Sequence, residues 1–276
     1  MTRRTLREPV TFAGVGLHTG HRSRVRCVPA RDGGIVFTRT DRPDSASVRA
    51  ALEAVSDAAR AVTLGTAAPV RTVEHLLAAA AVLGVTDLHV EVDGEELPAL
   101  DGSALPIAEA MRAVGFVELP GPHPVVRPSR PVYVVDGDAS VLALPARELR
   151  LTYVVRLRTP VLGTQVVDVP APALPRLLDA RTWGYVDEVE GLRAAGLARG
   201  AGRENALGIA PGGYITPPRG VDEPARHKAL DLLGDLSLLG RPLEAHVIAV
   251  AAAHRLHLAL VRRILETESE AAQRWN

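Results

Sequence analysis

The chain has 276 residues, of which 47% are hydrophobic and 23% are charged, and its formal net charge is zero. This length suits one large or two medium domains with adequate cores, and the composition argues against disorder. The balanced charge, with no dense basic block, lacks the electrostatic signature of nucleic-acid binding.

The N-terminal residues Met1–Leu6 lack the apolar run of a signal peptide, and no apolar stretch is long enough to span a bilayer. We therefore expect a cytoplasmic protein with no transmembrane segment and no nucleic-acid partner. Cys27 is the only cysteine, which excludes an intrachain disulfide and a thiolate metal cluster. It alternates with Arg24 and Arg26, as a buried thiol on a strand would.

The first third of the chain predicts a sheet. Alternating patterns indicate strands at Thr5–Thr11, Arg22–Val28 and Ile35–Thr40. The segment Gly14–Gly20 has three glycines in seven residues, so its backbone can approach another surface closely. His18 within it could face a cleft, although a plain tight turn explains the same residues.

A helix is predicted to start at Thr72, a favourable N-cap residue. Its first turn carries Glu74 and His75. Such a pair usually faces solvent, yet a distant histidine is also what a three-ligand metal site elsewhere would need, so both interpretations stay open. Further on, the patterns indicate a strand at Leu88–Val92, a capping turn at Asp101–Ser103 and a helix at Leu105–Val114.

Five prolines between Leu119 and Pro131 favour neither a helix nor a central strand. We place the domain boundary there, giving domains 1–121 and 122–276. In the second domain the predicted elements are strands at Val132–Val135, Ser140–Leu144 and Leu149–Val155, a short helix near Pro175–Ala180, a helix around His227, a strand at His246–Ala251 and a helix from His254 to Glu268. Each half is strands, then helix, strand and helix, which indicates a duplicated α+β unit.

On the helix around His227, three polar residues share one stripe. His227, Asp231 and Asp235 fall within about 80° of one another, and an imidazole and a carboxylate at i and i+4 can hold one metal ion. The surrounding Leu and Ala residues favour a partly buried stripe, which needs partners or a metal; a solvent-facing stripe is the alternative. Lys228 is the only lysine among 32 basic residues, which favours a specific role for its ammonium group.

Two more candidates follow from position and rarity. His254 stands where a strand meets a helix and could pair with Asp235, since a carboxylate that orients an imidazole is a common acid-catalyst arrangement. His257, one turn later, is predicted to be a surface neighbour. Asn205 is one of only two asparagines, which suggests either a specific hydrogen bond or an ordinary turn.

Together the motifs resemble the UDP-3-O-acyl-N-acetylglucosamine deacetylase family, from Arg4 to about Leu265. The resemblance implies two similar α+β domains, each a mixed sheet layered with two helices, packed helix face to helix face around the active site. The motifs that carry it are Gly14–Gly20 (GVGLHTG), Thr72–Leu76 (TVEHL), Asp101–Ala104 (DGSA), Ala180–Gly184 (ARTWG) and Arg226–Leu236 (RHKALDLLGDL).

The resemblance also implies a role for each site residue. It implies Zn²⁺ with an open coordination position for water. Histidine and carboxylate ligands also accept Fe²⁺, which is therefore the other candidate. The implied metal ligands are His75, His227 and Asp231. The implied catalytic residues are Glu74 as general base, Thr182 at the oxyanion, and His254 held cationic by Asp235. The implied substrate-binding residues are Lys228 near the diphosphate, Trp183 where the family has Phe, His18, Gly202, Arg203 and Asn205.

The implied reaction is hydrolysis of the 2-acetamido group of UDP-3-O-(3-hydroxyacyl)-N-acetylglucosamine to acetate and the free amine, the committed step of lipid A synthesis. We expect a monomer acting on this small molecule. Near 186–206, the insert that should border the acyl passage, Gly202 and Arg203 replace a Gly-Gly-Ser pattern followed by an apolar residue. A guanidinium suits a hydrocarbon poorly unless it points away. Two alternatives stay open: a zinc deacetylase of another N-acetylated sugar or sugar nucleotide, and a non-catalytic sugar-nucleotide or lipid-binding homologue.

Overall fold

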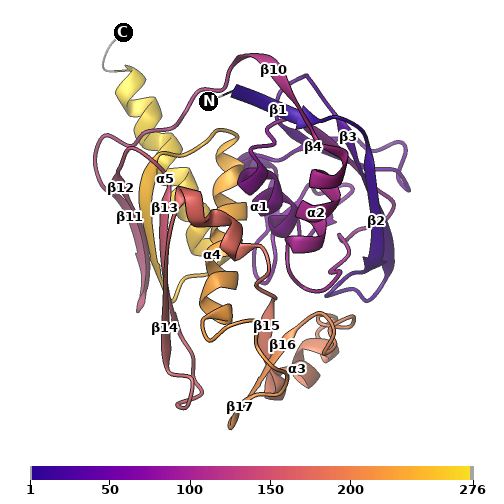
Figure 1. Ribbon diagram of the computed structural model, residues 1–276, viewed down its shortest axis with the longest axis vertical. Coiled ribbons are helices and arrows are strands. Elements are labelled where there is room, and N and C mark those ends of the chain that lie inside the picture. Colours follow the sequence, from indigo (N-terminus) through magenta and orange to yellow (C-terminus); the bar gives the residue numbers. More distant parts are fainter. Residues whose placement is uncertain (1, 274–276) are drawn as a thin grey trace.

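Two five-stranded sheets form the outer layers of the molecule, and helices fill the space between them (Figure 1). The computed structural model describes residues 2–273. The first sheet has the order β2 (Val10–Val15), β3 (Arg22–Pro29), β9 (Leu88–Val92), β4 (Ile35–Arg39) and β5 (Val48–Arg49). The second has the order β11 (Val132–Asp136), β12 (Ala139–Pro145), β18 (Ala245–Val250), β13 (Arg150–Arg156) and β14 (Thr164–Pro170).

The two sheets have the same topology. In the first, β9 is inserted between β3, to which it is antiparallel, and β4, to which it is parallel. In the second, β18 is inserted in the same way between β12 and β13. Each inserted strand lies between two helices in the sequence, so the repeated order of elements is also a repeated arrangement in space. The predicted duplication is therefore confirmed.

Four helices form the middle layer (Figure 1). They are α1 (Glu74–Leu83), α2 (Leu105–Val114), α4 (Glu223–Leu236) and α5 (His254–Gln273). Within the first unit α2 contacts β2, within the second α4 contacts β13 and α5 contacts β12, and α1 packs against α4 across the middle. The two units therefore meet helix face to helix face, as expected for the α+β fold.

The alternating strand patterns predict the core well. In β3 the side chains of Val25 and Cys27 are fully buried, and in β13 those of Leu151 and Tyr153 are too. Burial raises the pKa of the Cys27 thiol to about 12, so this thiol is an apolar core group. The structural role expected for Cys27 is confirmed.

Two predictions near the N-terminal unit are wrong. The single strand expected at Thr5–Thr11 is interrupted: β1 (Thr2–Leu6) ends before β2 begins and pairs with β10 (Phe116–Pro122) in a separate two-stranded sheet. Thr72 does not cap α1. It has a left-handed backbone with φ of 59°, and its hydroxyl donates to Glu96 Oε1 at 3.1 Å. A domain boundary after residue 121 stays a prediction.

Several short elements have too few residues to show a periodic pattern. The N-terminal unit contains η1 (Leu52–Ala54), β6 (Val55–Asp57), β7 (Thr63–Leu64) and β8 (Val70–Arg71). The C-terminal unit contains η2 (Ala171–Leu177), β15 (Trp183–Tyr185), η3 (Val186–Glu188), α3 (Val189–Ala194), β16 (Leu207–Ala210), β17 (Gly213–Tyr214) and η4 (Ser237–Leu239). The strands β15, β16 and β17 form a small sheet at one end of the molecule, beside the insert near 186–206 (Figure 1).

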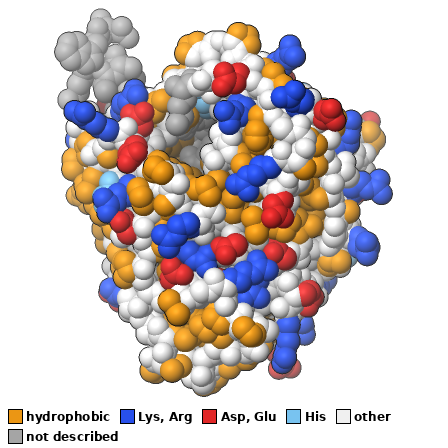
Figure 2. All heavy atoms as spheres, viewed as in Figure 1, with side chains coloured by type: hydrophobic (Ala, Val, Ile, Leu, Met, Phe, Trp, Pro, Cys, Tyr) orange, Lys and Arg blue, Asp and Glu red, His pale blue; other side chains and the backbone are white. Residues whose placement is uncertain are grey.

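The surface gives no sign of one dominant charge. On the face drawn in Figure 2, basic and acidic side chains are interspersed, in keeping with a net charge of zero. Among residues 2–273, no helix has the length and apolar character needed to cross a membrane.

The crossing of α1 and α4 depends on Gly234. A Cβ built on Gly234 would lie 2.9 Å from Cα of Glu74 and closer still to the Glu74 carbonyl oxygen. Gly234→Ala must therefore push the two helices apart. We expect it to lower the free energy of unfolding by about 1–3 kcal/mol, the usual effect of overpacking, as measured by urea denaturation.

The matched control is Gly191→Ala in α3, because a Cβ there meets no atom within 4 Å. This variant should be as stable as the wild type, or slightly more stable, since alanine favours a helix over glycine. A Gly234→Ala protein with the urea midpoint of the wild type would show that the helices do not cross at this position.

Candidate metal and catalytic site

The helix crossing brings the start of α1 against the polar stripe of α4. Asp231 Oδ1 lies 3.6 Å from His75 Nε2 and 3.4 Å from His227 Nε2. The two imidazole rings are perpendicular, with centroids 5.1 Å apart. All three side chains are buried, so the solvent-facing alternatives for His75 and for the α4 stripe are wrong.

The spacing of these three groups fits a tetrahedral cation. Ligand atoms about 2.0–2.1 Å from a zinc ion lie roughly 3.3–3.4 Å from one another. The two His–Asp distances, 3.4 and 3.6 Å, are close to that value, and the three donor atoms lie within 4.8 Å of one another. Two imidazoles and one carboxylate form a donor set typical of catalytic zinc sites, which keep the fourth position open.

A backbone carbonyl determines which ring nitrogen of His227 can bind a cation. His227 Nδ1 lies 3.1 Å from the carbonyl oxygen of Ala180, to which it can donate. Burial lowers the pKa of His227 to about 4, so its ring is neutral and Nε2 keeps a lone pair for a cation. A carbonyl partner of this kind is the usual orienting contact of a metal-bound histidine.

Lys228 contacts the other oxygen of the same carboxylate. Its Nζ lies 2.8 Å from Asp231 Oδ2. Burial alone would lower the pKa of Lys228, but the charge and hydrogen bond of Asp231, together with the charges of Asp235 and Glu74, outweigh burial and raise it. The ammonium group therefore stays charged beside the candidate metal ligands.

Glu74 is oriented by the backbone of a neighbouring segment. Its Oε2 accepts a hydrogen bond from the amide of Val62 at 3.1 Å, and its Oε1 lies 4.0 Å from His254 Nε2. Burial raises the pKa of Glu74 above that of an ordinary glutamate. A buried carboxylate with a raised pKa is a better proton acceptor, as a general base requires.

His254 is held by Asp235, as the sequence suggested. His254 Nδ1 lies 2.8 Å from Asp235 Oδ2, and His254 Nε2 lies 3.8 Å from Asp231 Oδ2. Burial opposes a charge on this ring, but the carboxylates around it, Asp235 foremost, raise the pKa of His254 to about 9. The side chain is therefore a buried imidazolium facing the candidate metal ligands.

The prediction that His257 lies on the surface is wrong. Its side chain is fully buried, and its Nδ1 lies 2.8 Å from the same Asp235 oxygen that contacts His254. The hydroxyl of Tyr153 lies 2.9 Å from His257 Nε2 and so completes the network. The spacing of three residues between the histidines, which puts both on one helix face, is the signal that could have identified His257.

Asp235, His254 and His257 also bring three potential ligand atoms together. Both imidazoles, however, lie 2.8 Å from one carboxylate oxygen. That is a hydrogen-bond distance and is shorter than the spacing of ligands around a tetrahedral zinc ion. The group is therefore a hydrogen-bond network, and the cluster of His75, His227 and Asp231 is the better metal site.

Thr182 and Trp183 lie where several segments meet. The Thr182 amide donates to the carbonyl of Gly102 at 2.7 Å, which joins the Asp101–Ser103 turn to the C-terminal unit. The indole of Trp183 donates to the Pro224 carbonyl at 3.2 Å, at the start of α4. These contacts fix both residues between the N-terminal unit, the small sheet and α4.

The turn at Gly14–Gly20 lies against the insert, as its glycines suggested. The amide of Arg199 donates to the His18 carbonyl at 3.0 Å, and His18 Nδ1 accepts from the Ala198 amide at 3.4 Å. Glu96, which the sequence did not single out, holds the turn from behind by accepting the His18 and Thr19 amides at 2.8 and 2.7 Å. His18 therefore connects the two units.

Asn205 shapes the end of the insert. Its Oδ1 accepts the amide of Gly202 at 2.8 Å, and its Nδ2 donates to the carbonyl of Gly200 at 2.9 Å. Asn205 is buried because its side chain bonds to the backbone of its own turn, which is one of the two expected roles. The neighbouring Arg203 is exposed.

A family model and several known proteins match nearly the whole chain. Residues 3–266 match the family model of UDP-3-O-acyl N-acetylglycosamine deacetylase. The chain is 42% identical to the UDP-3-O-acyl-N-acetylglucosamine deacetylase of Thermosynechococcus vestitus, over 96% of this chain and 94% of the relative. It is also 42% identical to the protein of that name from Phenylobacterium zucineum (96% and 93% covered) and 41% identical to that from Trichormus variabilis (96% and 99%). The chain therefore belongs to the UDP-3-O-acyl N-acetylglycosamine deacetylase family.

Proposed function

We propose that the protein hydrolyses the 2-acetamido group of a UDP-3-O-acyl-N-acetylglucosamine and releases acetate and the free amine, a step of lipid A synthesis. The observation that carries the proposal is the buried cluster of His75, His227 and Asp231, with the carboxylate of Glu74 beside it. The family membership and the relatives' names support the substrate class.

In this proposal His75, His227 and Asp231 hold a zinc ion. Zinc, when bound, supplies Lewis acidity, which makes a water molecule easier to deprotonate and polarises the acetamide carbonyl. The donor set also suits Fe²⁺. The spacing of the donor atoms fits a tetrahedral site, the geometry that zinc usually adopts in proteins.

The protein's own groups then move the protons. Glu74, oriented by the Val62 amide, accepts a proton from the attacking water while the hydroxyl oxygen bonds to the carbonyl carbon. The carbon–nitrogen bond then breaks, and the nitrogen takes a proton. His254, cationic and 4.0 Å from Glu74, stabilises the negative charge and can donate that proton.

The remaining residues bind and orient the substrate. We assign the hydroxyl of Thr182 to the oxyanion and the ammonium of Lys228 to the diphosphate, because a hydroxyl donor and a point charge suit these anionic groups. Trp183 provides an apolar or stacking surface, and His18 borders the insert. The exposure of Arg203 supports a passage that this guanidinium does not block, with Gly202 and Asn205 forming the turn beside it.

The two alternative functions are a protein without catalytic activity and a deacetylase with another substrate. A non-catalytic homologue should have lost a ligand or the base, yet His75, His227 and Asp231 form the cluster, and Glu74 and Asp231 both lie within 4.0 Å of His254 Nε2. A deacetylase of another N-acetylated sugar would keep the same residues, so only an assay separates it from our proposal.

The test is acetate release by zinc-loaded protein from UDP-N-acetylglucosamine with and without a 3-O-hydroxyacyl chain. We expect turnover of the acylated nucleotide and little turnover of the other. Preference for the unacylated sugar would establish the alternative substrate, and acetate release from neither would overturn the proposed reaction.

A further inference from the structure

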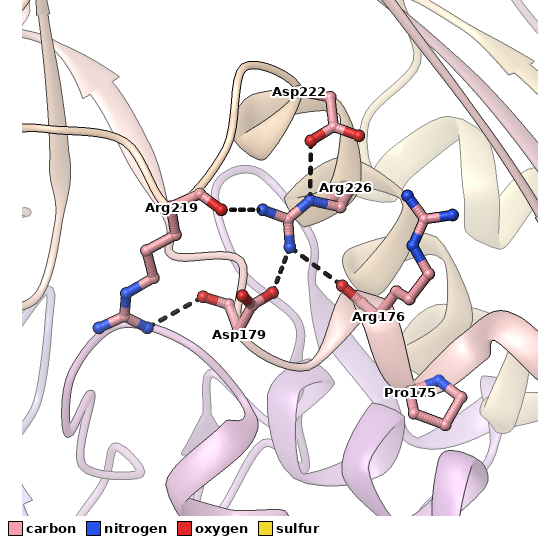
Figure 3. Close-up of a pocket in the computed structure, with 6 residues that line it drawn as sticks. All are labelled: Pro175, Arg176, Asp179, Arg219, Asp222 and Arg226. Carbon is pink, nitrogen blue, oxygen red and sulfur yellow. Dashed lines mark hydrogen bonds and ion pairs between the residues drawn. The ribbon is translucent and has the colours of Figure 1, made fainter.

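The segment Asp179–Thr182 is held along the first turns of α4 by two ion pairs, Arg226–Asp179 and Arg181–Glu223, of which the second is buried on both sides. The first is formed by Arg226, the residue before the metal ligand His227. Its guanidinium is bonded to the carboxylate of Asp179, donates to Asp222 Oδ1 at 3.0 Å, and donates to the carbonyls of Arg176 and Arg219 at 3.0 and 2.8 Å (Figure 3). Only 5% of Arg226 is exposed.

A second ion pair holds the other side of the segment. The backbone amide of Arg181 donates to Glu223 Oε1 at 3.0 Å, and its guanidinium donates to both carboxylate oxygens at 2.8 and 3.1 Å. Glu223 is fully buried in the first turn of α4. The residue between the two pairs is Ala180, so its peptide is fixed to α4 from both sides.

The carbonyl of Ala180 is the group that orients His227. Because His227 Nδ1 lies 3.1 Å from that oxygen, the ring is turned so that Nε2 faces Asp231 Oδ1, 3.4 Å away. A shift of the carbonyl would leave the ring free to rotate and would move the lone pair of Nε2 away from the cation. Partners of this kind commonly change metal affinity about 10–100-fold when they are removed.

We propose that Arg226, acting through Asp179 and the Ala180 carbonyl, is a positioning residue for the metal ligand His227. The inference deepens the proposed function, since it rests on the same metal site. It gives a use to a guanidinium outside the metal cluster: Arg226 lines a pocket of about 370 Å³ together with Asp179 and Arg219, and none of the candidate metal ligands lines it (Figure 3).

The test compares the zinc affinity of variants of the full-length protein, measured by competition with a chromophoric chelator. Asp179→Asn removes the charge of one partner, and Arg226→Met removes the guanidinium while keeping an unbranched side chain. We expect both to bind zinc about tenfold more weakly, toward the lower end of the range for such contacts because they act through a carbonyl. At saturating zinc, KM should stay close to that of the wild type.

The matched control is Arg176→Met. Arg176 lines the same pocket but contributes only its backbone carbonyl to Arg226 (Figure 3). This variant should bind zinc like the wild type, whereas an equal loss in all three variants would indicate a general disturbance of this part of the fold and overturn the proposal.

The test does not require both variants to fold. Asp179 is 42% exposed at its side chain, so Asp179→Asn should fold even if Arg226→Met does not. Folded Asp179→Asn protein with the zinc affinity of the wild type would overturn the proposal. The proposed reaction fails separately, if wild-type protein binds zinc but releases no acetate, because the affinity measurement needs no substrate.

Discussion

Replacing Glu74 by glutamine is expected to lower kcat by about 10³-fold while one zinc ion stays bound. General bases contribute roughly 10²–10⁴-fold to enzymatic rates. Glutamine keeps the shape of the side chain, and its amide oxygen can still accept the Val62 amide that orients Glu74, but it cannot take a proton at neutral pH. The measurement is acetate release together with zinc content, so that a missing base is distinguished from a missing metal.

The control for this variant is Glu91→Gln in β9. Glu91 is half-buried and pairs with Arg26 on the outer face of the sheet, away from the metal cluster, so the substitution should leave kcat unchanged. A Glu74→Gln enzyme that keeps more than a tenth of the wild-type kcat would exclude Glu74 as the base.

Removing the metal is expected to have an effect at least as large. Lewis-acid stabilisation is worth several kcal/mol, so chelation should lower the rate by about 10⁴-fold or more, and one equivalent of zinc should restore it. Zinc should also raise the Tm, because the ligands converge only in the folded chain. Both effects should disappear in His227→Ala, since this histidine supplies one of the three donor atoms.

The histidine control is His89→Ala. His89 lies on β9 and pairs with Asp32 at the surface, so it is not part of the buried metal cluster. This variant should keep the activity, the zinc content and the zinc-dependent Tm of the wild type. If His227→Ala still bound one equivalent of zinc with unchanged affinity, the ligand assignment would be wrong.

Local patterns predicted the elements that carry the site. The helical spacing of His227, Asp231 and Asp235 depends only on the geometry of one helix, and the structure has all three on the buried stripe of α4. The strand Leu88–Val92 and the helix Leu105–Val114 have the predicted bounds. The functions of Glu74 and His75 came from the family resemblance, because a Glu-His pair at a helix start has no chemistry that is unique to it.

Contacts between distant residues were not predictable from such patterns. Thr72 is a good cap by propensity, but Glu96 binds its hydroxyl and the backbone before α1 is left-handed instead. The spacing of His257 places it on the same helix face as His254, but the contacts with Tyr153 and Asp235 that bury it come from residues distant in the sequence. The Ala180 carbonyl that orients His227 has no side-chain signal at all.

The most direct test of the account is the position of the ion in zinc-loaded crystals, located by anomalous diffraction at the zinc edge. We predict one strong peak about 2.0–2.2 Å from His75 Nε2, His227 Nε2 and an oxygen of Asp231. A peak at Asp235, His254 and His257 instead, or no peak in protein that releases acetate, would contradict it.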